Sequence, residues 1–124
     1  MKSERKKRPE RESVAEACKA LSSPTRLKVF EIIRKGPDGK RGCAGDARPA
    51  EAPADSVCVC EILSEALNVS PPTVSHHLKE LRNAGLVEAT KCGQWQYYRA
   101  RREALEALES YFAVAGKKIK REKI

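Results

Sequence analysis

Residues 70–87 read SPPTVSHHLKELRNAGLV, and this stretch decides the fold. Ser70 is a typical N-cap residue, and Pro71-Pro72 suits a first helical turn, where backbone N–H groups have no intrahelical partner. Apolar residues then recur at the spacing of one helix face: Val74, Leu78 and Leu81. Gly85 stops this pattern, so the stretch predicts a helix from Ser70 to about Ala84.

A second helical pattern precedes this stretch and begins near Ser56, with Asp55 or Ser56 as its N-cap. Its apolar face consists of Val59, Ile62, Leu63 and Leu67. Asn68-Val69-Ser70 is then a three-residue turn between two helices. This is the geometry of a helix-turn-helix, whose second helix enters the major groove of DNA.

The residues that follow have the pattern of a β-hairpin. Residues 86–91 predict a strand, Cys92-Gly93 a turn, and residues 94–100 the returning strand. Helical patterns cover residues 13–21, 24–35 (capped by Ser23) and the segment from about Arg102. We therefore expect a mainly α fold with a small β-hairpin, in which the hairpin is the wing of a winged helix-turn-helix.

Composition shifts divide the chain into four parts. Residues 1–12 are expected to be a disordered basic arm, and residues 117–124 a basic C-terminal tail. Residues 13–116 form the expected DNA-binding and dimerisation domain. Inside that domain, residues 36–56 are rich in Gly, Pro and Ala without periodicity, which predicts a long loop insertion.

The net charge of +8 and the pI of about 9.4 suggest an anionic partner, either nucleic acid or an anionic membrane surface. No run of 18 apolar residues occurs, and no apolar stretch follows the N-terminal MKSERKKRPERES. The basic arm lacks the apolar face that stable membrane anchoring needs. We expect a cytoplasmic protein that binds double-stranded DNA and no membrane.

The residues expected to contact DNA carry hydroxyl, imidazole, amide or cationic groups. Such groups bind base edges or phosphates. On the second helix of the unit they are Thr73, Ser75, His76, His77 and Lys79, and on the hairpin they are Lys91, Gln94 and Arg99. The alternative is a pair of helices whose polar face is merely solvated.

Three stretches resemble the ArsR/SmtB family of metal-sensing repressors: LSSPTRLKVFEII, CVCEILSEALNVSPPTVSHHLKELRNAGLV and GQWQYYRA. The resemblance covers about residues 14–115 except the long loop. It implies a homodimeric winged helix with terminal helices at the dimer interface, and a repressor that releases its operator when metal binds. Pro71 stands where the family often has Gln, so any base contact made by that Gln is absent here.

Cysteine usage points to thiol chemistry. The five cysteines are an odd number without an export signal, so a disulfide framework is not expected. Cys58 and Cys60 lie at the expected start of a helix, where the helix dipole favours the thiolate. The alternative is two small buried apolar residues.

The spacing of this pair suggests a switch. In a regular helix, residues i and i+2 point in different directions, so Cys58 and Cys60 can share an ion only if the helix start is distorted or not yet helical. We hypothesise that distorting this start shifts the recognition helix relative to its dimer mate and weakens binding to two half-sites.

The CVCE sequence also resembles the thiol site of the family's arsenite, cadmium and lead sensors. Trivalent arsenic or antimony needs three thiolates, whereas cadmium or lead needs three or four. The residues after the pair are Ile62-Leu63-Ser64, so the third cysteine that some members have there is absent. The candidates for a further ligand are Cys43 in the loop and, from the partner subunit, Cys18.

Two further observations narrow the choice of ligands and of metal site. Cys92 lies at the expected tip of the wing and is predicted to be far from the site. The family's zinc site on the last helix uses His and carboxylates, but residues 101–124 contain no His, so a zinc sensor of that type is not expected.

We therefore expect a repressor that dissociates from DNA when Cys58 and Cys60 bind As(III) or Sb(III). A cadmium- or lead-responsive repressor and a redox sensor with a reversible disulfide are the alternatives. No nucleophile–base pair or cofactor loop accompanies the cysteines, so an enzyme is not expected.

Overall fold

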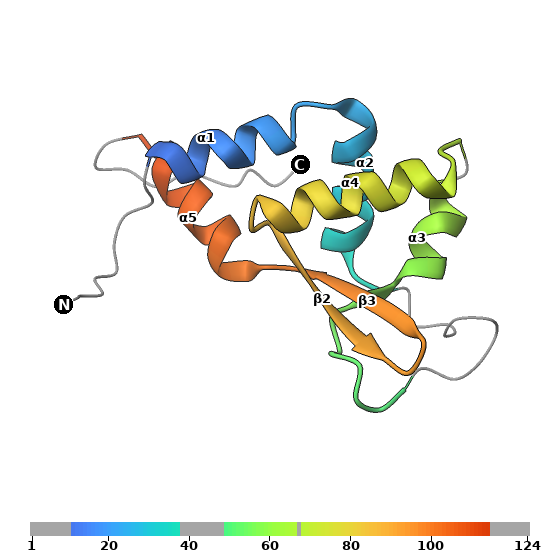
Figure 1. The fold of residues 1–124 in the computed structure, drawn as a ribbon. Coiled ribbons are helices and arrows are strands. Elements are labelled where there is room, and N and C mark those ends of the chain that lie inside the picture. Colours follow the sequence, from blue (N-terminus) through green and yellow to red (C-terminus); the bar gives the residue numbers. More distant parts are fainter. Residues whose placement is uncertain (1–10, 38–48, 67, 115–124) are drawn as a thin grey trace, which may run out of the picture.

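The computed structural model describes residues 11–37, 49–66 and 68–114. These residues form five helices and three strands (Figure 1). In chain order they are α1 (Arg11–Ala20), α2 (Pro24–Lys35), β1 (Val57–Cys58), α3 (Val59–Glu65), α4 (Pro71–Asn83), β2 (Val87–Cys92), β3 (Trp95–Ala100) and α5 (Arg102–Phe112).

The strands form one antiparallel sheet in the order β1-β3-β2. The β2–β3 hairpin runs in register from Val87 opposite Ala100 to Cys92 opposite Trp95. Gly93 makes the turn with a φ of +66°, a conformation that glycine adopts without strain. The predicted helix-turn-helix and the hairpin that follows it are both confirmed.

Strand β1 was not expected from the sequence. Val57 pairs with Tyr98 and Cys58 with Tyr97, so this segment is extended and α3 begins only at Val59. Ser56 is fully buried and its hydroxyl donates to the Pro53 carbonyl at 2.6 Å, so Ser56 does not act as a helix cap. Neither of the N-caps expected at residues 55 and 56 is therefore correct.

The N-caps of the two helices that begin with proline are as predicted. The Ser23 hydroxyl accepts from the Arg26 backbone N–H at 3.2 Å, and the Ser70 hydroxyl accepts from the Thr73 backbone N–H at 3.4 Å. Proline occupies the start of both α2 and α4. The local signals for these helices were sufficient because a cap and its helix are neighbours in sequence.

Helix α1 starts at Arg11, two residues before the expected domain boundary, and Ser13 lies inside this helix. The remainder of the expected arm, residues 1–10, and the expected tail, residues 117–124, lie outside the described residues. Most of the expected loop, residues 38–48, also lies outside them.

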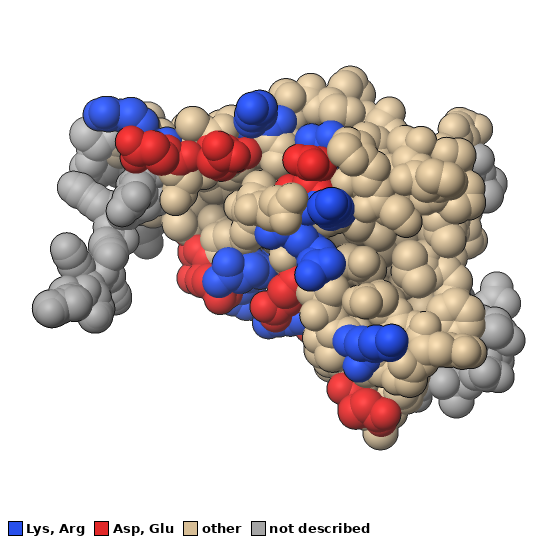
Figure 2. All heavy atoms as spheres, in the orientation of Figure 1, with Lys and Arg blue, Asp and Glu red and all other residues tan. Residues whose placement is uncertain are grey.

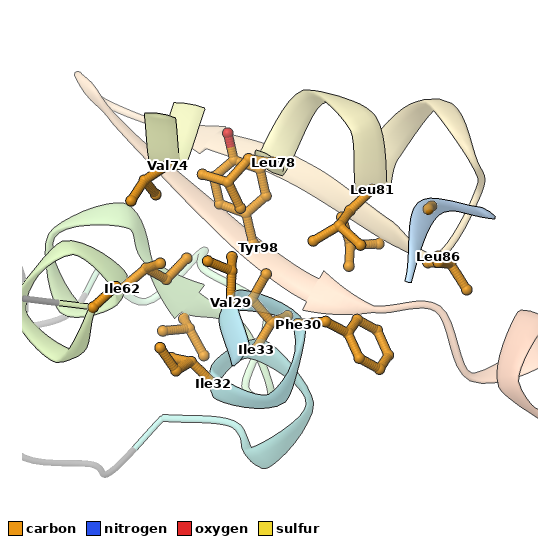
Figure 3. Close-up of a cluster of buried hydrophobic side chains, with 14 of the residues drawn as sticks. Val29, Phe30, Ile32, Ile33, Ile62, Val74, Leu78, Leu81, Leu86 and Tyr98 are labelled. Atoms are coloured by element: carbon orange, nitrogen blue, oxygen red, sulfur yellow. The ribbon is translucent and has the colours of Figure 1, made fainter. Parts of the chain in front are cut away.

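A large apolar core joins the helices to the sheet. Helix α2 packs against α3, α4 and β3. Figure 3 shows the side chains from these elements meeting in one cluster. Its labelled members are Val29, Phe30, Ile32, Ile33, Ile62, Val74, Leu78, Leu81, Leu86 and Tyr98. This core fixes α3 and α4 to the sheet and so positions the expected DNA-binding unit.

The elements lie around α4, which crosses the middle of the molecule in Figure 1. Helix α3 lies beside the N-terminal end of α4, and α1 and α5 lie toward its other end. The described helices are all too short and too polar to cross a bilayer.

His77 is buried, with 7% of its surface exposed, although we expected it to face DNA. Its Nδ1 atom accepts from Nε of Arg26 in α2 at 3.1 Å, and Arg26 also donates to the Ala20 carbonyl at 3.3 Å. Burial lowers the pKa of His77, and the charges of Arg26 and His76 lower it further. A neutral His77 therefore links α4 to α2.

Replacing Ile62 should destabilise the fold, because its side chain is fully buried between α3 and the core. We expect Ile62→Ala to lower the free energy of unfolding by about 2–5 kcal/mol. Urea unfolding followed by far-ultraviolet circular dichroism measures this. The matched control is Ser64→Ala on the exposed side of the same helix, which should change stability by less than about 0.5 kcal/mol.

The neutral His77 should make stability fall in mild acid. The unfolded chain takes up a proton at a pH of about 6.5, whereas the folded chain resists it, so stability is lost as the pH falls below that value. Asn at this position keeps an acceptor for Arg26 but does not titrate. We expect the melting temperature of the wild type to drop more than that of His77→Asn between about pH 7.5 and 5.5. The exposed control His76→Asn should keep most of the wild-type drop, because His76 is the smallest of the three causes that lower the pKa of His77. Equal drops in all three proteins would contradict this role of His77.

Candidate nucleic-acid interface and thiol site

Helix α4 presents most of the expected DNA-reading side chains on its exposed side. They are exposed at Thr73, Ser75, His76 and Lys79, while Val74 and Leu78 point into the core. Hydroxyl and imidazole groups can bind base edges, and Lys79 can pair with a phosphate. Apart from His77, the predicted reading residues of this helix are therefore available to a partner.

Charged side chains are unevenly distributed over the face of the molecule shown in Figure 2. In Figure 2 the surface over α3 and the N-terminal half of α4 is mostly uncharged. Lys and Arg side chains lie beside Asp and Glu side chains over α1, α5 and the hairpin. Phosphate contacts, which dominate affinity for DNA, must therefore come largely from residues around the reading helix rather than from its start.

The hairpin differs from the expectation at one residue. Lys91 and Gln94 are exposed beside the turn, as a DNA-contacting wing requires. Arg99 instead donates to Glu88 at 2.7 Å and to Asp55 at 3.4 Å, and 27% of its side chain is exposed. Two carboxylates thus offset its charge. Its visible role is to hold β3 to β2 and to the segment before β1.

Cys58 and Cys60 converge where β1 passes into α3. Cys58 is the extended residue before the helix (φ −70°, ψ 146°), and Cys60 lies in the first helical turn. Their sulfur atoms are 3.3 Å apart, a contact longer than the covalent S–S distance of about 2.05 Å. Cys58 is only 2% exposed and Cys60 is half-buried.

This geometry shows that α3 does not have to distort for the two sulfurs to meet. We expected that a regular helix would hold the two side chains apart and would have to distort when they bound one ion. Because β1 keeps Cys58 extended, the two sulfurs meet without any disturbance of α3. Of the two conditions that the spacing allowed, the segment satisfies the second: it is not yet helical at Cys58.

Cys92 lies near this pair, contrary to our expectation that it would be far away. It is 5% exposed and belongs to the same buried cluster as Cys58, together with Ala52 and Tyr97. The half-buried side chains packed against this cluster are Val59, Cys60 and Trp95. We call these seven residues the thiol cluster. It contains three cysteines and no charged side chain.

The other two candidate ligands are not part of the thiol cluster. Cys18 is exposed on α1. Helices α1 and α3 lie toward opposite ends of α4 (Figure 1). Cys43 lies outside the described residues. Among the residues that the structure describes, no three His, Cys, Asp or Glu side chains are close enough to hold one ion.

The sequence held a signal for the burial of His77 but none for the burial of Cys92. His77 falls on the same helical stripe as Val74, Leu78 and Leu81, at the i+3 position from Val74, which predicts burial. Cys92 directly precedes the glycine of the turn, at the end of a strand. Its burial depends on β1 and residues 49–56 covering that end of the sheet, which no local pattern reveals.

Known proteins resemble this chain in sequence. The model of the family described as "Bacterial regulatory protein, arsR family" matches residues 54–89. An uncharacterized HTH-type transcriptional regulator of Methanocaldococcus jannaschii is 37% identical over 87 residues, which are 70% of this chain and 76% of that protein.

Two relatives with named roles match over less of their own length. An arsenic resistance transcriptional regulator of Pseudomonas putida is 51% identical over 43 residues, 35% of this chain and 33% of that regulator. A cadmium resistance transcriptional regulatory protein of Listeria innocua is 41% identical over 86 residues, 69% of this chain and 56% of that protein.

Solved structures share the fold. An ArsR-like transcriptional regulator from Rhodococcus sp. RHA1 superposes with a TM-score of 0.59 at 23% identity, covering 81% of this chain and 76% of that one. A homodimeric winged helix-turn-helix DNA-binding domain from Mycobacterium bovis gives 0.57 at 24% identity, covering 81% and 75%. The chain therefore belongs to the arsR family of bacterial regulatory proteins, which are DNA-binding transcription regulators and not enzymes.

Proposed function

We propose that this chain is a cytoplasmic transcriptional repressor that binds double-stranded operator DNA as a homodimer and leaves it when Cys58 and Cys60 bind a soft metal or metalloid ion. As(III) or Sb(III) is the proposed inducer, and Cd(II) or Pb(II) is the alternative. The observation that carries the proposal is the 3.3 Å contact between the two sulfurs at the start of α3, the helix directly before the reading helix.

The DNA-binding part rests on α4 and the hairpin. Four polar side chains are exposed along α4: Thr73, Ser75, His76 and Lys79. Lys91 and Gln94 are exposed beside the hairpin turn, where a wing contacts the phosphate backbone or the minor groove. We propose these six residues as the DNA contacts, without His77 and Arg99.

The homodimer is supported by apolar surface at one end of the protomer. Tyr111 and Phe112, at the end of α5, are 45% and 55% exposed. A cleft of about 320 Å³ lies between α1, the end of α4 and α5, and Val14 and Leu108 line it. A second copy would cover such a surface, and the Mycobacterium bovis domain of the same fold is a homodimer.

A soft ion fits the donor set. Thiolates bind soft ions strongly, and Cys58 and Cys60 already meet without a change in α3. The chain is similar to an arsenic resistance regulator and to a cadmium resistance regulator, and this donor set can bind the soft ions of either element. A trivalent ion needs a further thiolate, for which the sequence suggested Cys43 or the partner subunit's Cys18.

The same sulfur contact favours a second candidate function. An oxidant such as a peroxide could join the two sulfurs as a disulfide, being itself reduced to water, and so make the protein a redox sensor. The two functions differ in what releases DNA: a soft ion under reducing conditions, or an oxidant without any ion.

Removing the reading residues should weaken DNA binding. We propose that the Lys79 ammonium pairs with a DNA phosphate, so Lys79→Ala should lower operator affinity. The slope of log affinity against log salt concentration should fall in magnitude by about one unit. The exposed control Lys28→Ala on α2 should change both quantities less. Fluorescence anisotropy with labelled operator at several salt concentrations measures both, and equal effects of the two substitutions would contradict the interface.

Removing either thiol of the pair should abolish the response. We expect arsenite, added under reducing conditions, to release operator from the wild type but not from Cys58→Ser or Cys60→Ser, because each loses one of two adjacent sulfurs. Cys18→Ser tests the thiol that the partner subunit could supply from α1, and a wild-type response there excludes Cys18 as the third ligand. A full response in both pair variants would refute the sensor. Release by peroxide but not by arsenite or cadmium would favour the redox function.

A further inference from the structure

Three of the four cysteines among the described residues belong to the thiol cluster. Two of them, Cys58 and Cys60, are in direct sulfur contact. Cys92 is the third, and it reaches the same cluster from the opposite side of β3. The pair needs a further thiolate to hold a trivalent ion, so the position of Cys92 bears directly on the proposed site.

The register of the sheet explains why Cys92 belongs to the same cluster as the pair. Cys58 lies opposite Tyr97, and Cys92 lies opposite Trp95 on the same strand. Side chains two residues apart on a strand project from the same face, so Cys58 and Cys92 share one face of the sheet. Strand β1 runs toward the Trp95 end of β3, so the chain that carries Cys60 continues toward Cys92.

We propose that Cys92 is the third thiolate of a site that it shares with Cys58 and Cys60, and that this site takes trivalent arsenic or antimony. The inference rests on the proposed function and deepens it by naming the third ligand. It also replaces a thiol outside the described residues with one that already packs in the thiol cluster.

The uncharged side chains of the thiol cluster favour a trivalent over a divalent ion, because the two complexes differ in net charge. Three thiolates around As(III) or Sb(III) form a neutral group, whereas three around Cd(II) or Pb(II) leave one negative charge. The thiol cluster has no charged member, and its other residues are Ala52, Val59, Trp95 and Tyr97. Burying an uncompensated charge among such side chains is costly, so the neutral complex is preferred.

Binding must move the wing. In the described conformation the three thiols are not close enough to hold one ion together. Strands on either side of β3 are about 10 Å apart at the backbone, so the end of the hairpin has to approach α3. Cys92 and Trp95 form the last pair of the ladder, where opening or bending disturbs the fewest hydrogen bonds.

This movement couples the ion to DNA. Cys92 lies next to Lys91 and two residues before Gln94, both proposed wing contacts. Tying Cys92 to the start of α3 therefore changes the position of the wing relative to the reading helix. The coupling runs through the hairpin, and α3 itself need not distort.

The binding step involves no oxidant or reductant. Arsenous acid, As(OH)₃, exchanges its three hydroxyl groups for three thiolate sulfurs. The three thiol protons leave with the three hydroxyl groups as three molecules of water. Phenylarsine oxide, which in water carries two exchangeable hydroxyl groups, takes only two thiolates by the same exchange, so it reports on the pair alone.

The test compares these two arsenicals on the full chain under reducing conditions. Isothermal titration gives the affinity, X-ray absorption gives the number of sulfur ligands, and the fluorescence of Trp95, the only tryptophan, reports on the thiol cluster. We expect Cys92→Ser to bind phenylarsine oxide like the wild type but arsenite at least about 100-fold more weakly, with two sulfurs instead of three. Cys43→Ser should keep three sulfurs and the wild-type affinity.

The remaining outcomes separate the two proposals. If Cys92→Ser binds arsenite with three sulfurs and wild-type affinity, Cys92 is not a ligand and this inference fails, while the proposed function stands. If the wild type binds neither arsenical, the proposed function itself fails. Retained phenylarsine oxide binding shows that the pair is intact, and an unchanged far-ultraviolet circular dichroism spectrum shows that the variant is folded. Cys92→Ala provides a second replacement without a hydroxyl group. A loss of three-sulfur binding in both Cys92 variants supports the inference.

Discussion

The pairing of the two-residue strand β1 with β3 sets the geometry of both candidate sites. By placing Cys58 opposite Tyr97, it holds the chain extended up to the residue at which α3 begins. Helix α3 then packs through the fully buried Ile62 against the core, and the turn after it presents α4. Strand β1 thus brings Cys58 and Cys60 together at the edge of the DNA-binding unit.

The two candidate sites are related through the sheet. Strand β3 pairs on one side with the strand that carries Cys58 and on the other with the strand that carries Lys91 and Cys92. An ion held at one edge can therefore alter the hairpin at the other edge over a short path. The reading helix, in contrast, is tied to α2 by the link between His77 and Arg26, which favours a rigid α4 and a movable wing.

Local signals predicted α2, α4, the hairpin and the caps at Ser23 and Ser70, because each depends on residues close in sequence. The strand β1 was missed because two residues carry no periodicity and their partner lies about 40 residues away. Burial of Cys92 depends on the same distant pairing. His77 could have been recognised from its place on the apolar stripe, but its imidazole favoured a functional interpretation. The third ligand could not be inferred from spacing, since the sheet, not the sequence order, brings the cysteines together.

We propose that ion binding at the thiol cluster and DNA binding weaken each other, and thermodynamic linkage tests this coupling most directly. If arsenite weakens operator binding by some factor, operator DNA must weaken arsenite binding by the same factor. The measurement is the arsenite affinity of the wild-type chain with and without saturating operator DNA. We expect operator DNA to weaken arsenite binding by the same factor by which arsenite weakens operator binding. An arsenite affinity that is unchanged by operator DNA would contradict this coupling.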